Sequence, residues 1–397
     1  MSVLVTNGEQ RSALAATRSL GRAGIRMIVA ASRQPCLAGV SRYCATAVKC
    51  PPPESEPQAF AEAIARAAEL DGVALIIPAS DAATMALSAH RDFLPSWCAL
   101  PLPAHDTVIA ATDRSALLSI AARLDVPQPL TWKQASDGVT FPAIVKPAAG
   151  RFGAEGRWRK PSPTTVRSRS EAERICSSYA EAGLEPIIQE HIPGEGYGVF
   201  ALCNHGEPLA LFAHRRLREK PPEGGVSVLR ESIPMLPDLV QPALRLLQAL
   251  KWRGLAMVEF RRDSRDGKFK LMEINPRIWG SLQLAIDSGV DFPRLLYDLM
   301  VESKWPDQVR YRTGVRSRWL MGDLDHLLIT LRRRNGATGP ALASFLRFWG
   351  ARYELERADD PLPALIEKMH YMSDTIRAVR LRIPRDLARR SATPVWG

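Results

Sequence analysis

The stretch Lys270–Ser281, KLMEINPRIWGS, decides the fold because it combines the start of a strand with a polar pattern. An acid, an amide and a cation fall at every second position, as Glu273, Asn275 and Arg277. Alternate residues of an extended chain point to the same side. One face of this strand end therefore presents a carboxylate, a carboxamide and a guanidinium together.

A second carboxylate is expected opposite this face. The segment GLAMVEFRRDSRDGKFKLMEINPR (254–277) predicts a hairpin with its turn at Ser264–Lys268. Antiparallel pairing across that turn sets Glu259 beside Glu273. Two carboxylates and an amide oxygen suit Mg²⁺, which keeps the rest of its shell for water and phosphate oxygens. Arg277 adds a positively charged guanidinium group that can donate hydrogen bonds to a phosphate or carboxylate oxygen. A half-exposed strand with a polar outer face is the alternative.

The whole chain has the length and composition of a globular protein. Its 397 residues favour two or three domains, and its apolar (46%) and charged (24%) shares exclude a disordered chain. No apolar run approaches the roughly 20 residues of a membrane span, and the N-terminus lacks the pattern of a signal peptide. The six cysteines form no CxxC pair, so we expect reduced thiols, no zinc site and a cytoplasmic location.

The formal net charge is +11, and basic runs at 310–319, 331–335 and 380–390 crowd the last quarter of the chain. No nucleic-acid motif accompanies them, and aromatic residues do not interleave as a base-stacking platform requires. We therefore expect no nucleic-acid partner and interpret the runs as solvated surface. An acidic partner or an anionic surface is the alternative.

The N-terminal region alternates strands and helices. A strand at the N-terminus, a helix over 9–20 and a strand over 24–32 predict a parallel, Rossmann-like sheet without the dinucleotide motif G-x-G-x-x-G. A further strand ends at Ser80 and Asp81, at the edge of the sheet where ligands bind. Asp81 is either a site residue or the cap of the next helix. The segment 94–103 is expected to be the last strand of this domain.

The pattern changes from Asp113 onward. A strand over 141–147 carries Lys146, and the glycine-rich segment 148–156 follows. Glycines let backbone N–H groups approach phosphates, although the segment is not a P-loop. A surface turn is the alternative. The segment 218–232 is interpreted as a long polar loop, and the chain after residue 281 is predicted to be mainly helical.

The stretch IIQEHIPGEGYGV (187–199) is an apolar strand that runs into a glycine turn. A strand of this kind offers free backbone groups to the edge of an adenine, and a nearby acid can accept ribose hydroxyl protons. An ordinary loop is the alternative.

In this order the pieces resemble the ATP-grasp superfamily. The match comprises the Rossmann-like start, a helix beginning at Asp113-Arg114, the Lys146 strand with its glycine loop, the hinge strand, and the carboxylate hairpin. It covers about residues 1–300 and is similar to bacterial ATP-grasp carboxylate–amine ligases and to carbamoyl phosphate synthetase and biotin carboxylase. Many members have Asp-Lys where this chain has Asp113-Arg114, and carbamoyl phosphate synthetase also uses arginine there.

The resemblance implies a set of site residues. Those for ATP are Arg114, Lys146, Gly150, Gly153, Gln189, Glu190, Ile192 and Glu195. Those for Mg²⁺ (or Mn²⁺) are Glu259, Glu273 and Asn275. Those for the substrate are His214, Arg215, Ser227 and Arg230. Lys146 and Arg277 are implied as catalytic.

The resemblance also implies roles. Lys146 and Arg114 contact phosphate, and the loop 149–156 closes as a lid over the β- and γ-phosphates. Residues 189–192 hold the adenine, and Glu195 accepts hydrogen bonds from the ribose hydroxyls. Arg277 faces the transferred phosphoryl group or the acyl phosphate. Arginines near the substrate pair with its carboxylate. A basic, solvated strand and loop is the alternative.

The implied fold is α/β (α+β), with a pre-ATP-grasp domain (1–108), an ATP-grasp domain (109–300, lid subdomain about 129–190) and a mainly helical C-terminal region (301–397). The implied enzyme is a ligase that joins a small-molecule carboxylate to an amine (or thiol) through an acyl phosphate and converts Mg-ATP to ADP and phosphate. We also expect a homodimer. A kinase or carboxylating enzyme on the same scaffold, or a degenerate binding protein, is the alternative.

Overall fold

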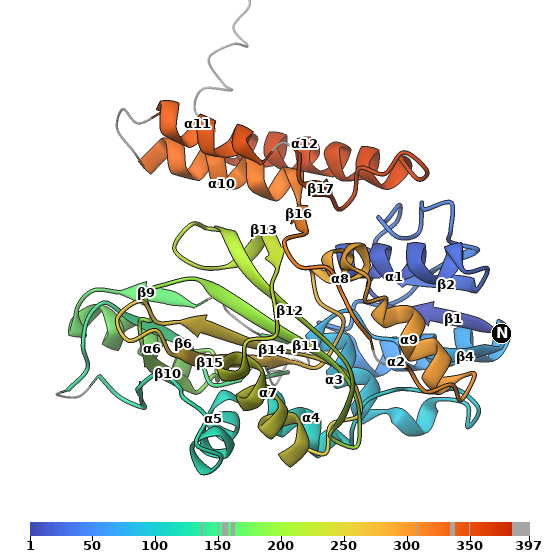
Figure 1. Ribbon diagram of the computed structural model, residues 1–397, viewed down its shortest axis with the longest axis horizontal. Helices are drawn as coiled ribbons and strands as arrows, with labels where there is room; N and C mark the ends of the chain where they lie inside the picture. The colour runs from blue at the N-terminus through green and yellow to red at the C-terminus, as the bar shows by residue number, and fades with distance from the viewer. Residues whose placement is uncertain are drawn as a thin grey trace, which may run out of the picture.

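The structure is a computed structural model that describes residues 1–135, 138–149, 151–152, 158–159, 163–307, 309–333, 338–348 and 350–382. Gly150 and Gly153, and most of the predicted lid loop, lie outside these ranges. Of the four sheets in these ranges, three carry the fold, and Figure 1 shows them from the first domain at the right to the segment predicted to be the lid at the left.

The first domain is a parallel sheet covered by helices on both faces, as predicted. Its strands are β1 (Ser2–Val5), β2 (Arg26–Ala31), β3 (Thr46–Lys49) and β4 (Val73–Ile77), in the order β3-β2-β1-β4. Its helices are α1 (Arg11–Arg22) on one face, and α2 (Pro57–Leu70) and α3 (Asp81–Ala89) on the other.

The predicted strand over 94–103 is wrong. A 3₁₀ turn, η1 (Arg91–Phe93), precedes the segment, and only Ala99 forms an isolated bridge, to Leu75. The three prolines of this segment have no N–H to donate to a ladder, which explains the absence of a regular strand.

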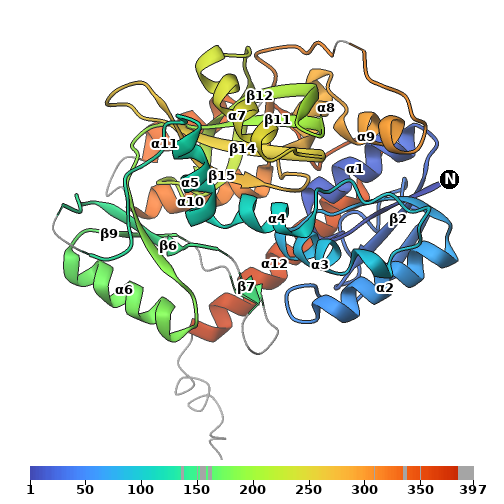
Figure 2. The ribbon, with the colours of Figure 1, turned by 90° about the horizontal axis from the view of Figure 1, so that it is seen from below.

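The segment predicted to be the lid, called the lid below, contains a small antiparallel sheet with its own core. Its strands are β5 (Thr131–Trp132), β6 (Ala143–Pro147), β9 (Thr164–Val166) and β10 (Pro186–Glu190), in the order β5-β10-β6-β9. Helix α6 (Arg169–Glu181) covers it, and the short pair β7 (Arg151–Phe152) and β8 (Trp158–Arg159) follows β6. Figure 2 shows this sheet on the side of the molecule away from the first domain, beyond α4 (His105–Thr112) and α5 (Arg114–Arg123).

The central sheet has seven strands in the order β15-β14-β11-β12-β13-β16-β17. They are β11 (Gly196–Asn204), β12 (Glu207–Lys220), β13 (Val226–Ser232), β14 (Gly254–Arg262), β15 (Phe269–Asn275), β16 (Arg316–Arg318) and β17 (Arg352–Tyr353). One face packs on α7 (Pro237–Ala249) and α5. The other face shares a core with α1, α8 (Leu282–Ser288) and α9 (Phe292–Met300), so it faces the first domain.

The C-terminal region is helical, as predicted, but it also completes the central sheet. Helices α10 (Leu320–Arg333), α11 (Thr338–Arg347) and α12 (Leu362–Arg382) lie together beyond the β13 edge of that sheet (Figure 1). Strands β16 and β17 come from the same region and extend the sheet past β13. In the described ranges, no helix combines the length and the apolar composition that a membrane crossing requires.

The segment 218–232 is not a long polar loop. Strand β12 continues to Lys220 and β13 begins at Val226, so the connecting turn is short. Charged residues occupy these buried strands because acids distant in sequence pair with them. Arg218 contacts Asp323, for example, with the closer oxygen at 2.6 Å. Interpretation of the basic run 310–319 as solvated surface is likewise wrong for Arg318, which is fully buried against the same aspartate.

Candidate active site

One row of the central sheet carries the predicted carboxylates. Glu273 pairs in register with Glu259, Glu259 with Gly198, and Gly198 with His214. Residues directly opposite each other in an antiparallel sheet share a face. The hairpin therefore has the predicted register, and both acids lie on the face that is turned toward the first domain.

Two glycines keep this face open between the strands. A Cβ atom on Gly198 would lie 2.9 Å from Phe200 Cζ and 3.0 Å from His214 Nε2. A Cβ atom on Gly196 would lie 2.7 Å from Arg216 Cδ. The absence of side chains at these positions gives room to the imidazole and lets Arg216 cross β11 toward β14.

Each predicted oxygen donor is held by an arginine. Glu259 forms an ion pair with Arg216, and Glu273 Oε2 lies 2.8 Å from Arg114 Nη2. Asn275 bridges the set, because its amide nitrogen lies 3.3 Å from Glu273 Oε1. Its Oδ1 accepts a hydrogen bond of 2.9 Å from the Nη2 atom of the arginine two residues later. Three guanidinium groups thus surround two carboxylates and one amide.

Glu259 and Glu273 interact electrostatically across the hairpin. Burial raises the pKa of Glu259; the positive charge of Arg216 opposes this shift, and the negative charge of Glu273 adds to it. Among the residues described, no three His, Cys, Asp or Glu side chains gather as a metal cluster. Two carboxylates with an amide oxygen are nevertheless the small donor set that Mg²⁺ takes when phosphate and water complete its shell.

Arg114 ties the lid to this hairpin. Asp113 caps helix α5 by accepting a hydrogen bond of 3.0 Å from Ala116 N, which places Arg114 at the first turn. Its guanidinium donates to Pro147 O at 3.0 Å as well as to the hairpin. Lys146, one residue earlier on β6, is 7% exposed. The structure therefore brings both predicted phosphate cations to the junction of lid and central sheet.

Arg277 connects the hairpin to the first domain. Its Nε donates to Asp81 Oδ1 at 2.6 Å. Ser80, rather than Asp81, caps helix α3, through a hydrogen bond of 3.1 Å from Ala83 N. The carboxyl end of β4 therefore supplies an acid to this site, and the interpretation of Asp81 as the helix cap is wrong.

Side chains of the predicted hinge are engaged within the protein. Gln189 Nε2 donates to Thr131 Oγ1 at 3.0 Å, while Glu190 pairs with Arg265. Ile192 is buried, and Glu195 is exposed and accepts a hydrogen bond of 3.3 Å from the hydroxyl of the tyrosine two residues later. The contribution of this stretch to a ligand would therefore come from its backbone and from Glu195.

The residues predicted to bind the substrate fall into two groups. His214 is 1% exposed, its ring nitrogens have no hydrogen-bond partner in the described part of the chain, and burial lowers its pKa well below the ordinary value. Arg230 is also 1% exposed, and its Nη1 donates to Ser227 O at 3.0 Å. Arg215 does not join them. It alternates with His214 along β12 and pairs with Glu231 on the other face, at 2.7 Å.

Two residues of this region escaped the sequence analysis: Arg11 and Glu354. Arg11 begins α1 after the carboxyl end of β1, the same edge that directed attention to Ser80. Glu354 lies in the C-terminal region, and no local pattern marks it.

Comparisons with known proteins agree with this geometry. Residues 184–322 match the family model "ATP-grasp in the biosynthetic pathway with Ter operon". A D-aspartate ligase of Enterococcus faecium is 22% identical over 287 residues, which are 66% of this chain and 67% of that protein.

Solved structures show the same fold. An L-amino acid ligase from Bacillus licheniformis superposes with a TM-score of 0.60 at 15% identity and covers 78% of each chain. A biotin carboxylase from Campylobacter jejuni superposes with a TM-score of 0.60 at 17% identity, over 79% of this chain and 74% of that one. The prediction of an ATP-grasp ligase agrees with the names of these relatives. The match of residues 184–322 to an ATP-grasp family model, and the fold that the chain shares with these solved structures, agree with the resemblance that the carboxylate hairpin indicated.

Proposed function

We propose that the protein is a ligase that uses Mg-ATP to join a small-molecule carboxylate to an amine through an acyl phosphate. The observation that carries the proposal is the convergence of Glu259, Glu273 and Asn275, each held by an arginine, on a sheet face left open by glycines. The names of the relatives, which include ligases for aspartate and for amino acids, support it.

In this proposal Glu259, Glu273 and Asn275 hold Mg²⁺, which neutralises charge on the transferred phosphate. Arg114 and Lys146 contact phosphate oxygens from the lid side, and Gly150 and Gly153 belong to a loop that closes over them. The backbone of residues 189–192 holds the adenine, and Glu195 accepts the ribose hydroxyls. Phosphoryl transfer needs little covalent help from the protein, so positioning and charge neutralisation are its main contributions.

The proposed reaction has two steps. A carboxylate oxygen of the acid attacks the γ-phosphorus, the bond to the bridging oxygen breaks, and ADP leaves. The amine nitrogen then attacks the acyl carbon, loses its proton, and expels inorganic phosphate. Arg277 lies at the exit of the metal-binding strand and stabilises the charge on the phosphoryl group in transfer. His214, Ser227 and Arg230 border the carboxylate substrate, whereas Arg215 faces away from it.

ADP release from Mg-ATP tests the proposal across pooled small carboxylic acids and amines. We expect ADP only when both an acid and an amine are present. Glu273→Gln should lower kcat/KM at least about 100-fold, the scale of one lost preorganised contact. Glu231→Gln is the matched control, because this acid lies on the other face of the same sheet.

Other outcomes would point elsewhere. ADP together with a phosphorylated single acceptor would replace the ligase by a kinase. Undiminished turnover in a folded Glu273→Gln variant would contradict the metal assignment. Binding of ATP without release of ADP in any pool would favour a binding protein.

A further inference from the structure

A continuous line of charged side chains leads from the predicted metal site to the first domain. Glu259 pairs with Arg216, which lies directly opposite Arg230 in the β12–β13 ladder. Arg230 pairs with Glu354 of the C-terminal region, and Glu354 pairs in turn with Arg11 at the start of α1. Neither Arg11 nor Glu354 lies within the residues that match the ATP-grasp family model.

Glu354 is held rigidly between the two arginines. Its backbone N–H donates to Arg318 O at 3.1 Å, and its carbonyl accepts a hydrogen bond of 3.0 Å from Arg18 Nη1. Its side chain is 2% exposed and also accepts a hydrogen bond of 3.1 Å from the hydroxyl of Ser317. A carboxylate with both ends fixed in this way determines the orientation of the guanidinium groups that it contacts.

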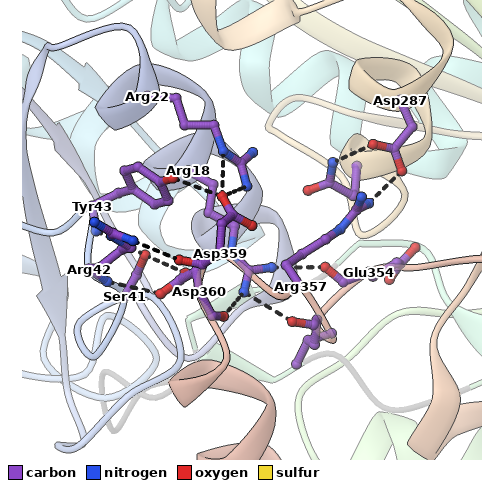
Figure 3. A network of polar contacts seen from close by, with 12 residues as sticks. Arg18, Arg22, Ser41, Arg42, Tyr43, Asp287, Glu354, Arg357, Asp359 and Asp360 are labelled. Atoms are coloured by element: carbon purple, nitrogen blue, oxygen red, sulfur yellow. Dashed lines mark hydrogen bonds and ion pairs between the residues drawn. The ribbon is translucent and has the colours of Figure 1, made fainter.

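The loop that carries Glu354 is fastened to the first domain (Figure 3). Arg18 Nε lies 2.8 Å from Asp360 Oδ2, and both side chains are almost fully buried. Asp360 also accepts a hydrogen bond of 2.7 Å from the Ser41 hydroxyl. Further out, Arg22 and Tyr43 bind Asp359 at an exposed position. The position of Glu354 is thus set in part by the buried contacts of its loop with α1.

The arginines carry more positive charge than Glu354 neutralises. Two guanidinium groups share this one carboxylate, and burial lowers the pKa of Arg11 to about 10. Arg230 is 1% exposed, and its Nε has no hydrogen-bond partner in the described ranges. The ring nitrogens of His214, on the neighbouring strand, are unpartnered in the same sense. Buried donors without partners are costly, so this arrangement fits an anion that would accept from them.

Arg11 is also placed beside the segment that follows Arg277. A Cβ atom on Gly280 would lie 3.2 Å from Arg11 Nη2, so the guanidinium rests against the segment that follows Arg277. The ring of Trp319 lies 4.0 Å from Arg11 Cζ and supports the guanidinium from the C-terminal region. An acid whose reacting carboxylate is near Arg277 could therefore extend a second anionic group toward Arg11.

We propose that Arg11 and Arg230 form a subsite for a non-reacting carboxylate of one substrate, and that Glu354 is the positioning residue that holds both arginines for it. The substrate is then an amino acid or a dicarboxylic acid rather than a simple acid or amine. This inference rests on the proposed ligase function for the meaning of the reacting group, but its test requires only binding. The C-terminal region becomes part of the substrate site through Glu354.

Binding measured by calorimetry on the full chain with Mg-ADP tests the subsite. The probes are L- and D-aspartate, L-glutamate, L-alanine and succinate, each compared with the carboxamide of its non-reacting group. We expect at least one acid to bind the wild type, and its carboxamide to bind at least about tenfold more weakly. Arg11→Gln and Glu354→Gln should each lower the affinity for that acid about tenfold or more and leave the affinity for Mg-ADP unchanged.

The matched control is Arg22→Gln, because Arg22 joins the same helix to the same loop but at an exposed position. It should bind the acid as the wild type does. A merely structural role of Glu354 would lower affinity for acid and carboxamide alike, whereas a positioning role removes the preference for the acid. Arg11→Lys keeps the positive charge but not the paired donors of the guanidinium, so it should retain part of the affinity that Arg11→Gln loses.

Three results would overturn the inference: equal binding of acid and carboxamide, unchanged acid binding in Arg11→Gln and Glu354→Gln, or no binding of any acid in the panel. Failure of the ligase proposal looks different. Acids would then bind with the predicted preference, yet no combination of acid and amine would release ADP.

Discussion

At the scale of residues, the site is a balance of buried charges. Glu259 and Glu273 face each other across the hairpin, and Arg216 and Arg114 neutralise them. Next to these acids lies His214, which burial and the neighbouring arginines keep neutral. The same face therefore carries acids that are paired with arginines and an imidazole that has no hydrogen-bond partner in the described part of the chain.

The pH dependence of stability should report on His214. Burial lowers its folded pKa below the unfolded value of about 6.5. As the pH falls below that value, the unfolded chain takes up a proton that the folded chain does not, so stability is lost toward acid pH. The loss approaches about 1.4 kcal/mol per pH unit for one group.

Thermal unfolding at pH 7, 6 and 5 checks this expectation. The stability advantage of the wild type over His214→Gln should shrink as the pH falls, because the variant has no imidazole to protonate. Parallel pH profiles for the two proteins would show that the imidazole is not held neutral by the fold.

At the scale of elements, the hairpin could be predicted from the sequence and the neighbouring strands could not. The E-x-N-x-R pattern lies within one strand, so its alternation is visible locally, and the register of Glu259 with Glu273 follows from a short turn. The segment 218–232 resembled a loop because its arginines look solvated. Their partners, Asp323 and Glu354, lie about a hundred residues further along the chain.

Glycine at position 198 is a requirement of this element. A Cβ atom there would press on Phe200 and on His214, so Gly198→Ala should cost about 1–3 kcal/mol of stability, the range found for overpacked cores. Chemical unfolding measures the loss. Gly339→Ala is the control, since open space surrounds that position and it lies within α11. Equal effects at the two positions would contradict the close packing described for this face.

At the scale of the whole molecule, the C-terminal region extends the central sheet and also contacts the first domain directly. The parallel first sheet and the order of the pieces could be predicted, because strand and helix periods are local. The docking of residues 354–360 on α1 could not, because Arg18 and Asp360 are separated by most of the chain. Nor does local sequence show that β16 and β17 extend the sheet.

The Arg18–Asp360 contact should therefore be a main determinant of overall stability. Asp360→Ala leaves a buried guanidinium without its carboxylate and the Ser41 hydroxyl without its acceptor, so we expect a loss of about 3–5 kcal/mol in the free energy of unfolding. Asp359→Ala removes an exposed partner and should cost about 0–1 kcal/mol. Similar losses in the two variants would show that burial does not distinguish these neighbouring acids.

The transfer of an oxygen atom tests the central claim most directly. In an acid and amine mixture that releases ADP, the carboxylate is labelled with ¹⁸O, and the inorganic phosphate is collected for mass spectrometry. A ligase that forms an acyl phosphate passes one carboxylate oxygen to each phosphate, so the account predicts one ¹⁸O atom per phosphate. Phosphate that carries no label, while the acid and amine are joined, would contradict it.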